Sequence, residues 1–310
     1  MLKMLIGSFS SIPWIYFALA SAAFYSVTNF IEKFLVEKRI KDPLLITIFS
    51  GLTSLILGII ILAFKGFHII AMDQLILILI SGIFLDFYLI PYFKALALDD
   101  ASKVVPLLQF SPIFVLVLSY IFLDEALTGK QLLGFALIIV SGFVLGAERI
   151  EKGIFTSGKS FWFMILASFL FSITGVLFKF VVITQDFWLT LAYESIGMGI
   201  GAFILLLRPA YRSSFRREIK KIKLDTSALL SVNQCFSVLA QLAISYAFFL
   251  APAALVSAIG GVQSFFVLLF GLILSIWFPR IIREKTDKIT IVTKVISIFF
   301  IFIGVYLVYI

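Results

Sequence analysis

The sequence predicts an all-α integral membrane protein with ten transmembrane helices, arranged as two inverted five-helix repeats. Hydrophobic residues make up 62% of the 310-residue chain, charged residues only 14%, and the mean hydropathy is +1.15. Soluble domains carry charge on about a quarter of their residues. The apolar residues here form windows of about 18 residues or more, the length that crosses a bilayer as a helix. These features exclude a soluble globular protein.

Charged residues, proline and glycine separate the apolar windows into ten spans. The break between the eighth and ninth spans rests on Pro252, supported by the equivalent acidic pair at 99–100 in the first half. The first five spans are expected at 13–34, 43–64, 74–98, 102–123 and 131–147. The second five are expected at 161–183, 187–208, 226–250, 252–278 and 289–310.

One phrase occurs in the first span of each half. Residues 26–34 (SVTNFIEKF) and 172–180 (SITGVLFKF) are identical at four of nine positions and lie 146 residues apart. Three further identities link 94–101 (KALALDDA) with 246–253 (YAFFLAPA), 152 residues later. Because each half holds an odd number of spans, the second half must enter the membrane upside down. We therefore expect a first repeat at 1–153 and an inverted second repeat at 154–310.

Lysine and arginine are unevenly divided between the two sets of loops. Loops after odd-numbered spans hold 18 of the 25 basic residues, whereas the opposite loops hold Lys3, Lys65 and Lys130. The positive-inside rule then places the odd loops in the cytoplasm and both termini outside, in a multi-pass protein of the plasma membrane. The net charge of +8 is thereby explained by topology rather than by a nucleic-acid partner. The basic stretch 208–223 is suited to lie on anionic headgroups as a short amphipathic segment.

A run of motif residues spans the third to fifth predicted helices. The stretch 92–114 contains a Ser111-Pro112 pair near its end, Glu125 follows the fourth span, and glycines at 134 and 142 mark the fifth. This pattern resembles the EamA-type domain of the drug/metabolite transporter superfamily. The resemblance is good over residues 85–147 and weaker in the second half.

In the second half Gln263-Ser264 replaces Ser-Pro, and Glu284 or Asp287 stands for the glutamate. The resemblance implies a secondary transporter or exporter of small polar metabolites, with a cavity between the halves. Members usually keep both termini in the cytoplasm, and the charge distribution here indicates the reverse. The direction of transport therefore stays open.

Ionisable residues inside spans are the first candidates for a substrate or proton pathway, because each costs about 2.5–3.5 kcal/mol to insert. Asp86 and Lys94 lie in the third span and Glu194 lies in the seventh. Asp86 and Lys94 are about 12 Å apart along a helix axis, so a direct ion pair is not expected. The alternatives are structural neutralisation of Asp86 by another neighbour and snorkelling of Lys94 to the interface.

Polar and small residues at helical spacing give a second group of candidates. They face protein or water, either as pathway residues or as close helix contacts, and the lysines that end the first two stripes are expected at the cavity mouths. The stripes are Ala22, Ser26, Asn29 and Lys33 in the first span, Ser168, Ser172, Gly175 and Lys179 in the sixth, and Gln234, Ser237, Gln241 and Ser245, with Asn233 alongside, in the eighth.

Proline and glycine positions suggest where helices bend or move. Pro91 and Pro112 each remove a backbone donor and can kink a helix beside the cavity. Gly260 and Gly261 are read either as a close contact or as a flexible gate. Gly197, which continues the face of Glu194, indicates tight helix contact.

The leading hypothesis is alternating-access transport of small polar or amphiphilic metabolites, with amino acids as one candidate, in which Asp86 or Glu194 exchanges a proton for substrate. The expected partners are a small-molecule substrate, the lipid bilayer and protons, and a monomer is plausible. A non-transporting lipid- or partner-binding protein is the alternative. A membrane-embedded transferase is disfavoured because the chain has one histidine, His68, one cysteine, Cys235, and no acidic cluster. No cofactor or metal is expected.

Overall fold

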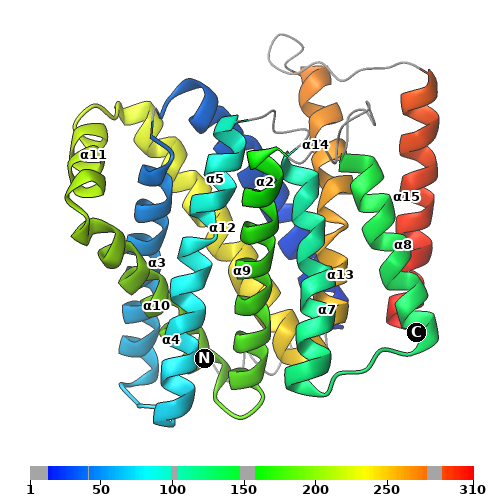
Figure 1. Cartoon of the computed structure of the whole chain (residues 1–310), viewed down its shortest axis with the longest axis horizontal. Coiled ribbons are helices and arrows are strands. Elements are labelled where there is room, and N and C mark those ends of the chain that lie inside the picture. The colour runs from blue at the N-terminus through cyan, green and yellow to red at the C-terminus, as the bar shows by residue number, and fades with distance from the viewer. Residues whose placement is uncertain (1–12, 41, 99–103, 147–157, 278–287) are drawn as a thin grey trace.

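The computed structural model describes residues 13–40, 42–98, 104–146, 158–277 and 288–310, and these residues form helices joined by short connections (Figure 1). The first half contributes α2 (Trp14–Lys38), α3 (Leu44–Lys65), α4 (Met72–Phe87), α5 (Leu89–Leu98), the 3-10 helix η1 (Val105–Gln109), α7 (Phe110–Leu123) and α8 (Gly129–Gly146). The second half contributes α9 (Lys159–Val182), α10 (Phe187–Leu207), α11 (Pro209–Ile219), α12 (Leu224–Leu250), α13 (Ala253–Gly260), α14 (Gln263–Trp277) and α15 (Lys288–Tyr309).

Eight of the described helical stretches are long and apolar enough to cross a membrane. Two shorter apolar helices, Leu107–Leu123 and Gly129–Leu145, lie where the fourth and fifth spans are expected. Large apolar side chains are exposed on the outside of the bundle, for example Ile56 on α3, Tyr120 on α7 and Phe302 on α15. An outer surface of this kind suits contact with lipid chains.

Three of the predicted spans differ in detail from single straight helices. The third is interrupted at Tyr88, between α4 and α5. Pro91 explains the break, because its ring nitrogen cannot donate to the carbonyl of Phe87. The ninth is interrupted after Gly260, between α13 and α14. The described part of the fourth begins as the 3-10 helix η1, and Pro112 lies in the first turn of α7, where a missing N–H costs little.

Local signals fix several helix ends. Asp186 begins α10, since its side chain accepts hydrogen bonds from the N–H groups of Trp188 and Leu189 at 2.9 and 3.1 Å. Gly66 ends α3 with a φ of 87°, a conformation that glycine adopts without strain. Asp124 ends α7 in the left-handed region, with a φ of 53°.

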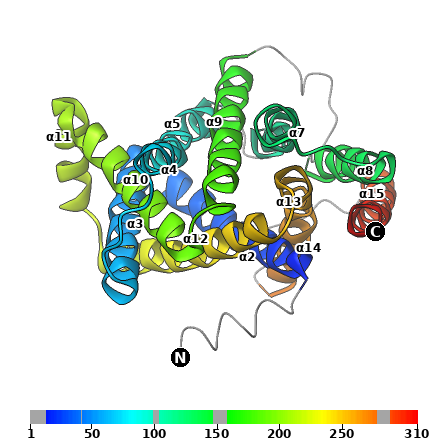
Figure 2. The ribbon, with the colours of Figure 1, turned by 90° about the horizontal axis from the view of Figure 1, so that it is seen from below.

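The helices pair across the two halves of the chain. α2 packs along α12, α3 along α10, α8 along α15, and α9 along α4 and α5. The α8–α15 pair forms one edge of the molecule and α11 projects at the opposite edge, as Figure 1 and Figure 2 both show.

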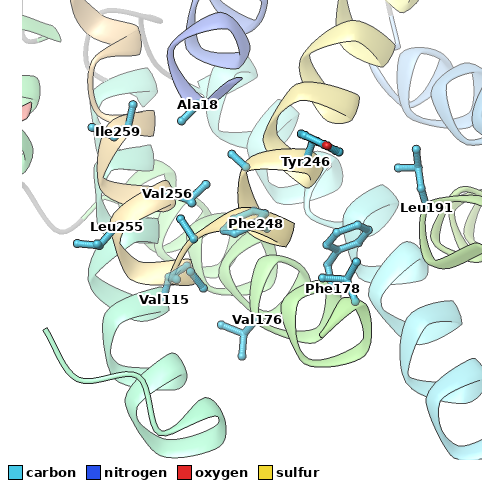
Figure 3. Close-up of a cluster of buried hydrophobic side chains, with 14 of the residues drawn as sticks. Ala18, Val115, Val176, Phe178, Leu191, Tyr246, Phe248, Leu255, Val256 and Ile259 are labelled. Carbon is cyan, nitrogen blue, oxygen red and sulfur yellow. The ribbon is translucent and has the colours of Figure 1, made fainter. Parts of the chain in front are cut away.

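The main hydrophobic cluster contains side chains from most of the long helices, among them α2, α7, α9, α10, α12 and α13. It includes Val115, Phe178, Tyr246, Phe248 and Ile259 (Figure 3). This packing lies beside one end of the cavity described below, because Val115, Phe178 and Phe248 also line it.

The basic stretch after the seventh span contains the short helix α11. Phe215 packs its apolar side against α3 and α10, and Ser214 donates a hydrogen bond to Asp42. Arg212 and Arg216 are exposed. The helix is therefore amphipathic, as the sequence predicts for this stretch.

Candidate functional site

A cavity of about 190 Å³ lies between the helices of the two halves. Its wall comes from α2, α3, α4, α5, η1 and α7 of the first half and from α9, α10, α12, α13 and α14 of the second. The wall combines apolar side chains with acids, amides and hydroxyls. A hollow of this kind, enclosed by bundle helices, is the usual setting of a small-molecule site.

Glu194 lies on the cavity wall and is held by a chain of hydrogen bonds. Its carboxylate accepts from the hydroxyl of Ser81 at 2.8 Å and from Nε2 of Gln241 at 3.1 Å. The hydroxyl of Tyr25 donates in turn to Oε1 of Gln241 at 2.9 Å. The side chain is 2% exposed. The structure thus brings together two of the predicted pathway residues, Glu194 and Gln241, and adds Tyr25 and Ser81 to them.

Glu32 is a second acid on the wall, and the sequence analysis did not select it. It lies on α2 one turn after Asn29 and two turns after Tyr25, and all three line the cavity. Its Oε1 accepts a hydrogen bond of 3.4 Å from Nδ2 of Asn233. The signal was present in the sequence, because Tyr25, Asn29 and Glu32 follow helical spacing. The prediction from sequence instead assigned the pathway to the neighbouring face of the helix, which ends in Lys33.

The residues of the predicted stripe that ends in Lys33 do not all face the cavity in the structure. Asn29 lines the cavity, whereas Ser26 is not among the lining residues, and its hydroxyl lies 2.7 Å from the backbone oxygen of Ala22 and 3.1 Å from that of Gln263 on α14, either of which can accept its proton. Lys33 is exposed at the end of the stripe. On α9, Ser172 is buried and donates to the carbonyl of Phe169 at 2.6 Å, and it is not among the cavity-lining residues.

Asp86 is fully buried but lies outside the cavity wall. It faces the glycines of two neighbouring helices: a Cβ atom added at Gly51 on α3 or Gly201 on α10 would come within 3.0 or 3.2 Å of a carboxyl oxygen. Neither of its carboxyl oxygens has a hydrogen-bond partner in the described part of the chain. An unpartnered carboxylate is costly in such a place.

Lys94 lies on the exposed side of α5. Its ammonium is 5.6 Å from the centre of the Phe163 ring, a cation–π contact. The lysine and the cavity therefore occupy different faces of the helix.

The amides of α12 divide between the cavity and its surroundings. Gln234 and Gln241 line the cavity, and the Thr53 hydroxyl donates to Gln234 at 3.4 Å. Asn233 is fully buried next to Glu32 and is not among the lining residues.

Lys179, the counterpart of Lys33 in the duplicated phrase, lies with Glu125 where α12 ends and α13 begins. The Lys179 ammonium donates to the backbone oxygens of Phe248 at 2.7 Å and Ala251 at 2.9 Å, where α12 ends. Glu125 accepts from the N–H of Ala253 at 2.6 Å, where α13 begins. We call these five residues the Lys179–Glu125 clamp. It fixes the junction between α12 and α13 beside the apolar end of the cavity.

Charge and burial oppose each other at Glu125. Burial raises the pKa of its carboxyl above the ordinary value, while the hydrogen bond from Ala253 and the nearby Lys179 ammonium act in the opposite direction. The motif glutamate thus has a defined contact in the structure, with the second half of the chain. Its approximate counterparts Glu284 and Asp287 lie outside the described residues.

The glycines of the ninth span differ in their surroundings. A Cβ atom at Gly260 would meet nothing within 4 Å, and this residue lines the cavity. A Cβ atom at Gly261 would lie 2.9 Å from Ile138, and the Gln109 amide donates to the Gly261 oxygen at 3.4 Å. Close packing therefore applies to Gly261, whereas Gly260 has free space. Pro91 lies at the α4–α5 break, and Pro112 lines the cavity.

The formal charges on the wall are of one sign. Among the described residues that line the cavity, Glu32 and Glu194 are acidic, and none is lysine, arginine or histidine. The described parts of the chain contain no group of three histidine, cysteine, aspartate or glutamate side chains that could hold a metal ion. The site as built can bind and position a solute through carboxylates, amides and hydroxyls.

Comparisons with known proteins give a family match over part of the chain and a match of the fold. The model of the EamA-like transporter family matches residues 12–147. An uncharacterized protein of Methanocaldococcus jannaschii is 38% identical over 130 residues, which is 41% of this chain and 92% of that protein. A solved crystal structure superimposes with a TM-score of 0.68 at 13% identity, covering 95% of this chain and 97% of the other. At that identity the likeness concerns the fold alone.

Proposed function

Since the chain belongs to the EamA-like transporter family, we propose that it is a secondary transporter that moves a small polar or amphiphilic metabolite across the membrane by alternating access. Amino acids are one candidate class. The observation that carries the proposal is the central cavity, which helices of both halves enclose and which presents Glu194 and Glu32. A site at the interface of two halves is what alternating access requires.

The pairing of helices supports two inverted repeats of five spans, at 1–153 and 154–310. The first apolar helix of each half packs on the third of the other: α2 on α12, and α9 on α4 and α5. The second helices, α3 and α10, pack together, and so do the fifth, α8 and α15. A two-fold relation between the halves demands this reciprocity. The relative from Methanocaldococcus jannaschii, matched over 92% of its length by 130 residues, supports a unit of half this size.

The Lys179–Glu125 clamp supports a conformation closed at one end. Its counterpart residue Lys33 is exposed. Along α2 the lining residues Ala18 and Ser21 are 0% and 1% exposed, whereas Asn29 and Glu32 are partly exposed. We expect solute to enter at the Glu32 end in this conformation. Opening of the clamp, with closure around Lys33, would expose the cavity to the other side.

Glu194 is the better of the two predicted residues for proton coupling. It lines the cavity and has donors that stabilise its charged form, whereas Asp86 has neither property. A proton on Glu194 would compete with a bound solute, which is the simplest way to couple the two movements.

Uptake into proteoliposomes tests the function. The full chain would be reconstituted and screened in counterflow with labelled amino acids, amines and nucleosides. We expect at least one solute to accumulate above protein-free liposomes, and an imposed pH gradient to change its rate in the wild type but not in Glu194→Gln. Asp73→Asn, an exposed acid at the start of α4, is the matched control and should respond to pH like the wild type.

The alternative, a non-transporting lipid- or partner-binding protein, gives a different outcome. In that case a solute or lipid would stabilise the purified protein against heat, but no labelled solute would exchange. A rate that follows the pH gradient equally in Glu194→Gln would leave transport intact and remove the proton role of this residue.

A further inference from the structure

We infer that the central cavity selects organic ammonium compounds, that is, solutes with a positively charged nitrogen on a partly apolar body and without a carboxylate. The inference deepens the proposed function and rests on it for transport, although the binding preference stands on the cavity alone. The charges, the aromatic rings and the unpartnered polar atoms of the wall favour this class of solute.

Charge is the first support. Glu32 and Glu194 face the cavity from α2 and α10, and the described lining residues include no basic side chain. The lysines that the sequence brings near the site lie elsewhere: Lys33 and Lys94 are exposed, and Lys179 is bound to backbone oxygens in the clamp. An anionic solute would meet two acids and no compensating charge in a place of low dielectric.

The two carboxylates differ in the number of hydrogen bonds that they already accept. Both oxygens of Glu194 accept hydrogen bonds, from Ser81 and Gln241. The described contacts of Glu32 comprise a single hydrogen bond, the long one of 3.4 Å from Asn233. A carboxylate has room for about four donors. Glu32 therefore keeps free acceptor capacity, which an ammonium group fills with charge-assisted hydrogen bonds.

Aromatic residues form much of the remaining wall. Tyr25, Tyr88 and Tyr92 line the cavity near Glu32, and Phe171 continues this surface with its ring 4.9 Å from that of Tyr88. The faces of aromatic rings attract cations. Such a wall accommodates both the charge and the apolar body of an organic amine.

Three polar atoms of residues that line the cavity have no hydrogen-bond partner among the described residues. The hydroxyls of Ser21 and Ser111 line the cavity at 1% and 3% residue exposure, and neither oxygen has a hydrogen-bond partner among the described residues. The amide nitrogen of Asn29, one turn before Glu32, is also unpartnered. Buried polar groups are nearly always satisfied. A solute that carries a hydroxyl or carbonyl beside its ammonium would satisfy them.

Binding to the purified full chain tests the preference with probes that differ in charge alone. 2-Phenylethylamine, L-phenylalanine, 3-phenylpropionate and 2-phenylethanol share one aromatic body, and tyramine, tetramethylammonium and putrescine extend the cationic set. Calorimetry and thermal shift would give the affinities. We expect at least one amine to bind about tenfold or more tightly than the neutral, zwitterionic and anionic probes, a factor typical of one charge-assisted contact.

Variants separate the carboxylates from general folding effects. Glu32→Gln should weaken amine binding about tenfold or more, while Glu32→Asp, which keeps the charge, should retain most of it. Glu218→Gln, the same substitution on α11 away from the cavity, is the matched control and should bind like the wild type. The inference is overturned if the neutral or anionic probe binds as tightly as the amines, if none of the amines binds, or if Glu32→Gln binds like the wild type.

The outcomes also separate this inference from the proposed function. Amine binding without exchange in proteoliposomes would retain the binding preference and remove transport. Exchange of an anionic or neutral solute, without amine binding, would retain transport and remove the preference.

Discussion

At the scale of single residues, the structure separates the buried acids by their surroundings. Glu194 has two donors and lines the cavity, Glu32 has one distant donor there, and Asp86 has none and lies between helices. Burial alone therefore does not mark a pathway residue. An acid that must change its charge during transport needs contact with solvent or solute, and Asp86 lacks it in this conformation.

Asp86 gives the first prediction. Because its carboxyl is packed against Gly51 and Gly201 without donors, size should matter more than charge. We expect Asp86→Asn to keep the thermal stability within about 1 kcal/mol of the wild type, whereas Asp86→Glu, one methylene larger, loses about 1–3 kcal/mol. Thermal unfolding in detergent, followed by tryptophan fluorescence, measures both. The reverse order would mean that a charged Asp86 stabilises the fold.

Sequence reasoning found Glu194 and Gln241 but missed Glu32, and the reason is geometrical. Neighbouring positions on a helix are separated by about 100°, so faces ending in Glu32 and Lys33 look equally regular in a sequence. Which of them meets the cavity depends on how α2 packs on α12 and α14. The spacing of residues in one helix contains no information about that packing.

At the scale of helices, glycines decide how closely α4 and α10 approach. A Cβ atom at Gly82 would lie 2.0 Å from the backbone oxygen of Glu194 and 2.7 Å from Gly197. A Cβ atom at Gly197 would lie 2.4 Å from the oxygen of Leu79. The tight contact that the sequence predicts at Gly197 is thus confirmed, and it also fixes the backbone that carries Glu194.

The second prediction concerns this contact. Gly82→Ala should push α10 away from α4, because the added methyl group meets backbone atoms that cannot rotate aside. We expect a loss of about 1–3 kcal/mol in stability and weaker solute binding through the displaced Glu194. Gly129→Ala, where nothing lies within 4 Å of the added Cβ atom, is the matched control. Equal melting temperatures for both variants would contradict the prediction.

The third prediction concerns the Lys179–Glu125 clamp. Glu125→Ala removes the acceptor of the Ala253 N–H, and Lys179→Met removes the donor to the oxygens of Phe248 and Ala251. Either change should free the α12–α13 junction, so backbone amides at 250–256 should exchange hydrogen for deuterium about tenfold faster, as loss of about 1.4 kcal/mol implies. Mass spectrometry of peptides from this region measures the effect.

A control variant on the same side of the molecule tests whether this effect is local. Lys65→Met breaks the ion pair of 3.1 Å with Asp186, which lies outside the clamp. Surface pairs contribute little, so exchange at 250–256 should stay at the wild-type rate. Unchanged exchange in both clamp variants would mean that other packing holds the junction.

Helix positions follow from sequence better than helix breaks do. Hydropathy alone locates the spans, since every long apolar window needs a helix to satisfy its backbone in lipid. The break at Tyr88 has a sequence signal in Pro91, but the break after Gly260 has only a glycine pair, which equally suits close packing. Whether a glycine pair breaks a helix or allows close packing depends on the residues around it, and these residues belong to other helices.

At the scale of the whole molecule, the distribution of charge predicts one orientation in the membrane. The helix pairs described above pack the two halves against each other, and α11 with the residues after it holds Arg212, Arg216, Arg217, Lys220 and Lys221 in one connection. A strong excess of basic residues on one side sets orientation during insertion. The orientation is therefore open to test independently of the substrate.

The last prediction uses the single cysteine of the chain to map the two sides. Cys235 is exposed on α12, beside the exposed apolar residues Val232 and Leu239, and Cys235→Ser would leave a chain without thiols. Into this background Ser213→Cys on α11, or Ala126→Cys in the connection between α7 and α8, would be introduced one at a time. Both positions are small and exposed, so neither change should disturb the fold.

A maleimide that cannot cross membranes should label Ala126→Cys in intact cells, and should label Ser213→Cys only after the membrane is opened, since α11 belongs to the basic side. With α11 in the cytoplasm, the Lys179–Glu125 clamp faces outside and the Glu32 end of the cavity faces the cytoplasm. The reverse labelling pattern would place both termini inside and assign the clamp to the cytoplasmic face. The helix pairing and the cavity would be unchanged, because neither depends on which side of the membrane each end of the bundle faces.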